Sequence, residues 1–155
     1  MLRASATTKT PGPGVGFGRM ARTTIDELLA DARNGLTRLD PIATRDAVRR
    51  GAALIDIRGD WQLAQDGVIA GALVIPRNVL EWRLDPTSRH RHPHAPDLDD
   101  HVIVMCNDGF QSSLAAATLQ LLGFTHATDL DGGFQAWRAA GLPVDQFAAP
   151  EESKR

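Results

Sequence analysis

The sequence predicts an α/β protein whose parallel β-sheet carries helices on both faces. Short, almost continuously apolar segments occur along the chain, and such segments are typical of strands buried on both sides. In the second half of the chain these segments alternate with others in which the apolar residues recur at the spacing of an α-helix. This alternation predicts strand–helix–strand units and therefore a parallel sheet. In such sheets, sites form at the carboxyl ends of the strands.

Two helices are predicted before the first strand. Thr24-Ile25-Asp26-Glu27 has the form of a capping box, in which the Thr hydroxyl and the Glu carboxylate satisfy free backbone N–H groups. Apolar residues at helical spacing follow, and Asn34-Gly35 gives a stop signal. A second helix is predicted from Asp40-Pro41, with Asp as the N-cap and Pro in the first turn, to Gly51.

The remaining elements are predicted from the same two patterns. Strands are expected at 53–57, 73–75, 101–105 and 125–130, of which the run Val102-Ile103-Val104-Met105 is the strongest. A helical turn is expected at 78–83, a polar loop with three prolines at 85–100, and helices at 112–122 and 133–140. Ser112 is expected to cap the first of these two helices, and Trp137 is expected to pack in the core.

One domain is predicted over residues 23–147. Residues 1–22 are expected to form a disordered tail and residues 148–155 a frayed one. The glycines of segment 12–18 do not make a phosphate loop, because neither the spacing nor the flanking strand is right. Whether Met1 or Met20 is the true start stays open.

Composition excludes several classes of partner. The 17 basic and 19 acidic residues give a formal charge of −2, which provides no overall attraction to nucleic acid or acidic membranes. No apolar run approaches the roughly 20 residues of a membrane span, and no export signal is apparent. The single cysteine excludes an intramolecular disulfide and favours a reducing compartment, the cytoplasm.

That cysteine lies in the loop between the strongest strand and the following helix. A short loop there curls its backbone N–H groups inward and makes a nest for an anion, to which the helix dipole adds. Gly109 permits a positive φ and a close approach of the backbone. Such a nest stabilises the Cys106 thiolate as a nucleophile and would equally hold the outer sulfur of a persulfide. The alternative is that Cys106 is an inert core residue.

Four motifs resemble the rhodanese family, from about Leu39 to Val144. Cys106, Gly109 and Ser112 fit its loop pattern C-x-x-G-x-R-S, and Asp56-Ile57-Arg58 resembles its D-x-R at the end of a strand. The segment 67–72 resembles the family's G-H-I-P-G-A, and residues 130–144 resemble L-x-G-G-x-x-x-W followed by G-x-P-V. The resemblance implies a rhodanese-like parallel sheet with helices on both faces.

The resemblance also implies a sulfurtransferase that needs no cofactor. Cys106 would be the catalytic nucleophile and would take a sulfur from a small donor such as thiosulfate. A thiol or a protein acceptor would then remove the sulfur, in two steps through one covalent intermediate. The substrate would be bound by Asn107, Asp108, Gly109, Phe110, Gln111, Ser112 and Arg58.

Some positions depart from the family pattern. Gln111 stands where active members often have an arginine, Asn107 occupies another position that is often basic, and Asp108 adds a negative charge. Val68 and Ala70 replace the usual His and Pro. A missing guanidinium at roughly 6 Å changes the binding of a dianion by about a kcal/mol or more. The sequence therefore predicts persulfide chemistry more firmly than efficient use of thiosulfate.

Three side chains near these motifs have two interpretations each. Arg58 would either supply charge to the pocket or form a salt bridge with Asp56, Asp60 or Asp66. Trp61 and Trp82 would either line the pocket mouth or pack in the core, and packing is the favoured role.

Three rival functions remain. A cysteine phosphatase needs an arginine six residues after its nucleophile, where this chain has Ser112. A metal site could use His90, His92, His94 and His101, but a solvated loop without metal is favoured because no familiar ligand spacing occurs. The main alternative is a non-catalytic rhodanese module that binds a protein or passively carries sulfur.

Overall fold

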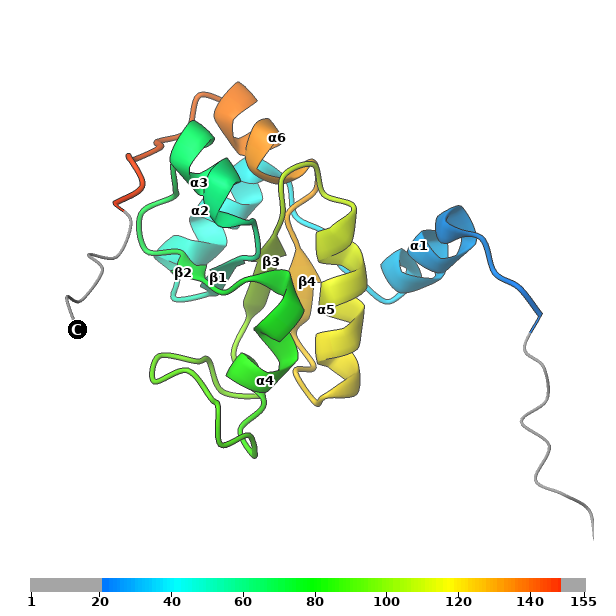
Figure 1. Cartoon of the computed structure of the whole chain (residues 1–155). Coiled ribbons are helices and arrows are strands. Elements are labelled where there is room, and N and C mark those ends of the chain that lie inside the picture. The colour runs from blue at the N-terminus through cyan, green and yellow to red at the C-terminus, as the bar shows by residue number, and fades with distance from the viewer. Residues whose placement is uncertain (1–20, 149–155) are drawn as a thin grey trace, which may run out of the picture.

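The computed structural model describes residues 21–148, in which four parallel strands form one sheet (Figure 1). In their spatial order the strands are β2 Leu73–Val74, β1 Ala53–Asp56, β3 Val102–Met105 and β4 Ala127–Asp129. Each lies within a segment that the sequence predicts as a strand. The predicted α/β class is therefore confirmed, whereas the tails predicted at 1–22 and 148–155 fall almost wholly outside the described residues.

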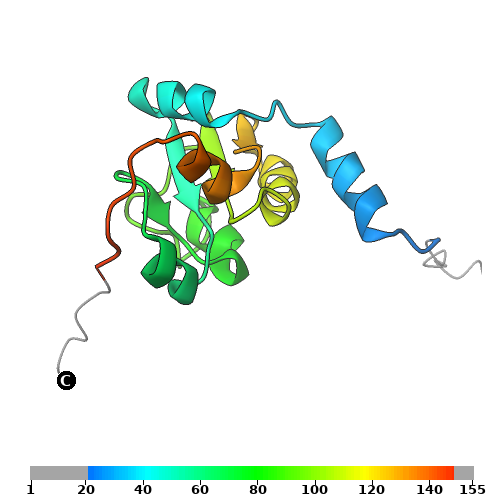
Figure 2. The same cartoon turned by 90° about the horizontal axis from the view of Figure 1, so that it is seen from above.

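Helices cover both faces of the sheet (Figure 2). Side chains along a strand point alternately to the two faces, so neighbouring residues enter different cores. Leu54 and Ile103 lie in the core beneath α2 and α6, and Ile55 and Val104 lie in the core beneath α4 and α5. The helices are α2 Pro41–Arg49, α6 Gly133–Ala139, α4 Leu80–Leu84 and α5 Gln111–Leu121, with a short 3₁₀ turn, Arg77–Val79, before α4.

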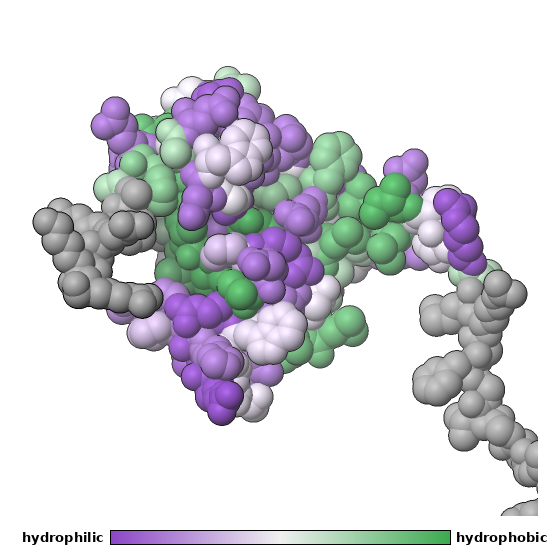
Figure 3. Space-filling view, in the orientation of Figure 1, coloured by the Kyte–Doolittle hydropathy of each residue, from purple (hydrophilic) through white to green (hydrophobic). Residues whose placement is uncertain are grey.

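The helix α1, Ile25–Asn34, stands to one side of the sheet and packs on α5 (Figures 1 and 2). Its predicted capping box is present: Thr24 N–H donates to Glu27 Oε2 at 2.8 Å, and Glu27 N–H donates to Thr24 Oγ1 at 3.2 Å. No residue of α1 is buried. Figure 3 shows hydrophobic surface over α1 and α5, where Ile25, Leu28 and Leu121 are exposed.

Register brings the ends of three strands to one edge of the sheet. Asp56 pairs with Met105 across β1 and β3, and Val104 pairs with Asp129 across β3 and β4. The residues that follow these pairs, including Cys106, therefore emerge side by side at the carboxyl edge.

Three sequence-based expectations were wrong. Helix α3, Asp60–Asp66, was missed, because it has only seven residues and buries only Leu63, which leaves no visible periodicity. Trp61 and Trp82 do not pack in the core, since they are 69% and 59% exposed. Ser112 does not cap α5: the helix begins at Gln111, and no side chain caps it.

Within residues 21–148, none of the helices has both the length and the apolar character that a membrane crossing requires.

The core on the α5 face predicts a contrast between two leucines of that helix. Leu119 is fully buried, so Leu119→Ala should lower the free energy of unfolding by about 2–5 kcal/mol. Leu121 is 88% exposed, so Leu121→Ala should change it by about 0.5 kcal/mol or less. Urea unfolding of both variants measures the difference, and similar losses in the two would show that α5 packs otherwise.

Candidate active site

Cys106 directly follows β3 and lies at the carboxyl edge of the sheet. Its side chain is nearly buried, at 6% exposure. The loop folds back over it, so that the backbone N–H groups of Gly109 and Ser112 donate to Sγ at 3.2 and 3.3 Å. Hydrogen bonds from two converging amides stabilise a sulfur anion at this position.

A small cavity of about 160 Å³ opens beside Cys106. Four residues of the following loop and two residues from the β1–α3 region line it with the cysteine: Asn107, Asp108, Phe110, Gln111, Arg58 and Gln62. Five of these six are residues that the sequence predicts for the site. Gly109 and Ser112 contribute their backbone instead, and Gln62 was missed because its helix was missed.

Arg58 is the only cation among the described residues that line the cavity, and the salt bridge with Asp56, one of its two sequence-based interpretations, is present. It forms a fully buried ion pair with Asp56 at 2.7 Å, and its Nη2 also donates to the Gly67 carbonyl at 2.8 Å. The guanidinium lies 3.8 Å above the ring of Phe134. Its Nη1 is buried and has no hydrogen-bond partner among the described residues.

The turn before α6 packs directly against the Cys106 loop. The N–H groups of Phe134 and Gln135 donate to the carbonyls of Cys106 at 2.9 Å and Asn107 at 3.0 Å. A Cβ added to Gly133 would lie 2.5 Å from the Cys106 carbonyl oxygen, and one added to Gly109 would lie 2.7 Å from Gly132 N. Only glycines allow two backbones to approach this closely.

Asp129, at the end of β4, anchors the other side of the loop. Its fully buried Oδ2 accepts hydrogen bonds from the hydroxyls of Ser112 at 2.8 Å and Ser113 at 2.7 Å. Arg38 adds a salt bridge to Oδ1 at 2.9 Å. Burial acts to lower the pKa of Arg38, but its hydrogen bond to Asp129 and the charges of Asp129 and Asp131 outweigh burial and raise that pKa. Arg38 is therefore charged.

Asp129, Arg38 and Ser113 were not predicted as site residues. Asp129 follows a predicted strand core and stands at the sheet edge where sites form, so the strand pattern offered a signal for it. Arg38 lies 91 residues from Asp129 in the chain, and no local pattern connects the two.

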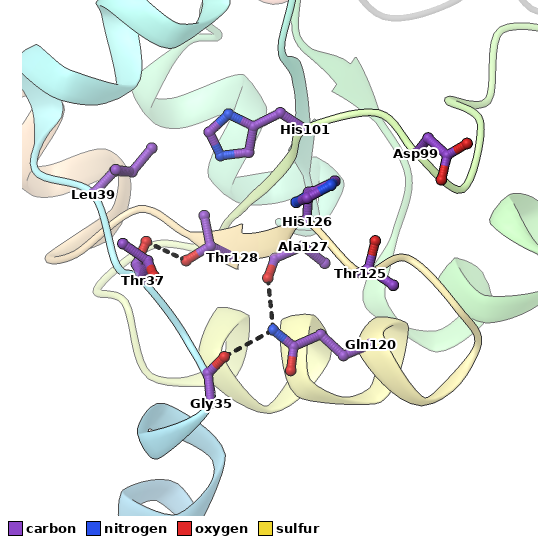
Figure 4. A pocket seen from close by; sticks show the side chains of 10 residues that line it. All are labelled: Gly35, Thr37, Leu39, Asp99, His101, Gln120, Thr125, His126, Ala127 and Thr128. Carbon is purple, nitrogen blue, oxygen red and sulfur yellow. Dashed lines mark hydrogen bonds between the residues drawn. The ribbon is translucent and has the colours of Figure 1, made fainter.

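A larger hollow of about 400 Å³ lies at the opposite, amino edge of the sheet (Figure 4). His101, which precedes β3, and His126, which precedes β4, line it with Gln120. Gln120 crosses its floor and donates to the carbonyls of Gly35 and Ala127 at 2.9 and 3.0 Å. Burial, together with the charges of His126 and Arg50, holds the pKa of His101 below its ordinary value. This hollow is separated from Cys106 by the length of β3.

The histidines of the 85–100 loop do not assemble into a ligand set. His92 Nδ1 accepts the N–H of His94 at 3.0 Å, and their rings lie 5.7 Å apart. Across residues 21–148, no group of three His, Cys, Asp or Glu side chains is placed to hold a metal ion.

Comparison with known proteins gives one family. A family model described as the rhodanese-like domain matches residues 40–140. The thiosulfate sulfurtransferase GlpE of Ectopseudomonas mendocina is 36% identical over 115 residues, which cover 74% of this chain and 95% of that protein. A sulfurtransferase of Allochromatium vinosum is 30% identical over 112 residues, covering 72% of this chain and 92% of that protein.

Solved structures agree on the fold. A protein from Rhodopseudomonas palustris, described as of unknown function and a possible tyrosine phosphatase, is 29% identical with a TM-score of 0.74. The match covers 84% of this chain and the whole of that one. The polysulfide-sulfur transferase homodimer of Wolinella succinogenes is 22% identical with a TM-score of 0.63, covering 81% of this chain and 90% of that one, and shows the same fold.

The contact between the two glycine turns predicts a selective effect at Gly109. Gly71→Ala should cost roughly 1–2 kcal/mol because of its positive φ of +80°, and Gly109→Ala, with φ +85°, should cost at least as much. Only at Gly109 does the added Cβ meet backbone, so only Gly109→Ala should also displace the loop and change the rate at which iodoacetamide alkylates Cys106. Equal alkylation rates in the two variants would contradict this.

Proposed function

Because the chain belongs to the rhodanese-like domain family, we propose that it is a sulfurtransferase that carries sulfane sulfur as a persulfide on Cys106. Its relatives are named sulfurtransferases, and the matches span nearly their whole length. The observation that carries the proposal is the convergence of two backbone N–H groups on Sγ beside a cavity of small-molecule size. That arrangement suits a nucleophile that alternates between a thiolate and a persulfide anion.

In the first step the Cys106 thiolate attacks the outer sulfur of the donor. With thiosulfate, the sulfur–sulfur bond breaks, sulfite leaves with the bonding electron pair, and the outer sulfur stays on Cys106 as a persulfide anion. The two backbone amides stabilise the charge on Sγ in the thiolate, and after the transfer the negative charge lies on the outer sulfur, one bond further into the cavity.

In the second step a thiophilic acceptor removes the sulfur. A cyanide ion or a thiolate attacks the outer sulfur, the persulfide bond breaks, and the Cys106 thiolate is regenerated. The chain has no second cysteine, so the acceptor is external. A reducing compartment such as the cytoplasm would keep this lone thiol available between turnovers, and that location stays a prediction.

The charges around the cavity bear on which donor is used. Arg58 is a cation of the cavity lining, but its side chain is fully buried and Asp56 already balances the charge of its guanidinium. The rim adds Asp108 and the neutral Asn107 and Gln111 rather than a further cation. We therefore expect binding of a dianion to depend on backbone amides and one shared guanidinium, with modest affinity for thiosulfate.

The same charges argue against a phosphatase. The position that would need an arginine is Ser112, whose hydroxyl donates to the buried Asp129 instead of facing the cavity. A phosphate dianion would then lack a bidentate partner beside the nucleophile.

A non-catalytic module for protein binding is the second candidate. It is favoured by one observation: Phe110 lines the cavity and yet is 61% exposed, as an aromatic residue in an interface would be. In that case Cys106 would accept no sulfur at a useful rate.

Cyanolysis tests the proposal directly. The protein incubated with thiosulfate and cyanide should release thiocyanate, and Cys106→Ser should release none because the nucleophile is gone. Intact mass after exposure to thiosulfate or polysulfide should show one added sulfur on the wild-type chain only. If neither donor loads Cys106 and no thiocyanate forms, the sulfurtransferase proposal fails and the binding module remains.

Restoring a cation at the rim should raise the use of thiosulfate. Gln111→Arg should increase kcat/KM for thiosulfate on the order of tenfold, since a guanidinium at this distance attracts the dianion. Gln146→Arg makes the same charge change on an exposed residue outside the cavity and serves as the control. No gain, or an equal gain in both variants, would show that rim charge does not limit the reaction.

A further inference from the structure

The carbonyl oxygen of Gly109 accepts hydrogen bonds from two arginines. Arg33 Nη2 and Arg38 Nη2 each lie 2.8 Å from it. Arg33 belongs to α1 and Arg38 to the segment between α1 and α2. Both precede residues 40–140, the part of the chain that matches the family model. The loop that carries Cys106 is thus held from outside by residues that precede the segment matched by the family model.

This contact determines which way the next amide points. In a trans peptide the C=O and the following N–H point in opposite directions. The Gly109 carbonyl points out toward the guanidinium groups, so the Phe110 N–H points back into the loop that surrounds Cys106. Among residues 21–148 this N–H has no acceptor, whereas the amides of Gly109 and Ser112 already bind Sγ. The Phe110 amide is therefore available to a second anionic atom beyond Sγ.

We propose that Arg33 and Arg38 are positioning residues that fix the Gly109–Phe110 peptide so that its N–H binds the outer sulfur of the Cys106 persulfide. The inference rests on the proposed sulfurtransferase function and deepens it. Helix α1 buries no residue, and the proposal gives it the role of holding Arg33 against the loop. Neither arginine touches the sulfur, because both act through the backbone of the loop.

Further contacts hold Arg33 in this position. Its Nε donates to Ser113 Oγ at 3.1 Å, and Ser113 in turn donates to Asp129 at 2.7 Å. Its guanidinium carbon lies 5.6 Å from the centroid of the Phe110 ring. Arg38 reaches the same carboxylate of Asp129 directly. The two guanidinium groups are thus tied to one buried anchor and to one carbonyl, which leaves the peptide little freedom to turn over.

Arg33 is the residue to change, because α1 lies outside both cores and Asp129 keeps its ion pair with Arg38. Arg33→Met should lower kcat/KM for sulfur loading from thiosulfate on the order of tenfold, through kcat more than KM, since a charge-assisted hydrogen bond is lost. It should also slow alkylation of Cys106 by iodoacetamide at neutral pH. Arg33→Lys, which keeps one charged donor, should recover part of both rates.

Arg45→Met is the matched control. Arg45 lies on α2, pairs with Asp46, and makes no contact with the loop, so its replacement should leave both rates unchanged. Thermal unfolding of each variant should stay close to that of the wild-type chain.

Three results would overturn the inference. They are wild-type rates in Arg33→Met, an equal loss in Arg45→Met, or a loss that follows a lowered Tm and is not recovered by Arg33→Lys. The alkylation arm needs no sulfur donor. If the wild-type chain takes up no sulfur, the proposed function fails, and the alkylation rates still decide whether the arginines position the loop.

Discussion

Each backbone N–H that the loop directs toward Cys106 requires a carbonyl that faces away, and the surrounding structure supplies a partner for those carbonyls. The Cys106 and Asn107 carbonyls receive the first amides of α6, and the Gly109 carbonyl receives two arginines. A buried carbonyl without a partner would cost about as much as a lost hydrogen bond. The conformation of the loop therefore depends on the groups that bind its outward-facing carbonyls as well as on the cavity side. The glycines of the 132–133 turn allow the backbone before α6 to approach the loop closely enough for these hydrogen bonds.

The sequence predicted the elements whose signals are local. Apolar runs identified every strand of residues 21–148, cap and stop residues identified α1 and α2, and the C-x-x-G-x-x-S spacing identified the loop that folds over Cys106. Helix α3 was not predicted, because a single buried leucine gives no helical periodicity of apolar residues. Arg33 and Arg38 were missed for a different reason: they contact Gly109 across 76 and 71 residues of chain, and such contacts exist only once the sheet has formed. Ser112 was identified as a site residue, but its hydroxyl serves the buried carboxylate rather than a helix end.

Charge at the site is arranged in two layers. On the cavity side, Arg58 and Asp56 cancel each other in full burial, so little net positive charge faces a ligand. Behind the loop, Arg33 and Arg38 stand with the carboxylates of Asp129 and Asp131, and both guanidinium groups donate to the Gly109 carbonyl rather than into the cavity. A site built this way favours a single negative charge at one point near Sγ over a dianion spread across the cavity.

Helix α1 lies outside both hydrophobic cores, yet it contacts the loop that folds over Cys106. The segment matched by the family model begins after this helix. A hydrogen-exchange experiment would accordingly resolve this helix as its own unit of local opening, held by its contacts with α5 and with the loop. When that unit opens, the sheet stays closed while the backbone around the sulfur loses a constraint. Under the proposal, the sheet and both cores lie outside α1, whereas the backbone around Cys106 depends on that helix through Arg33.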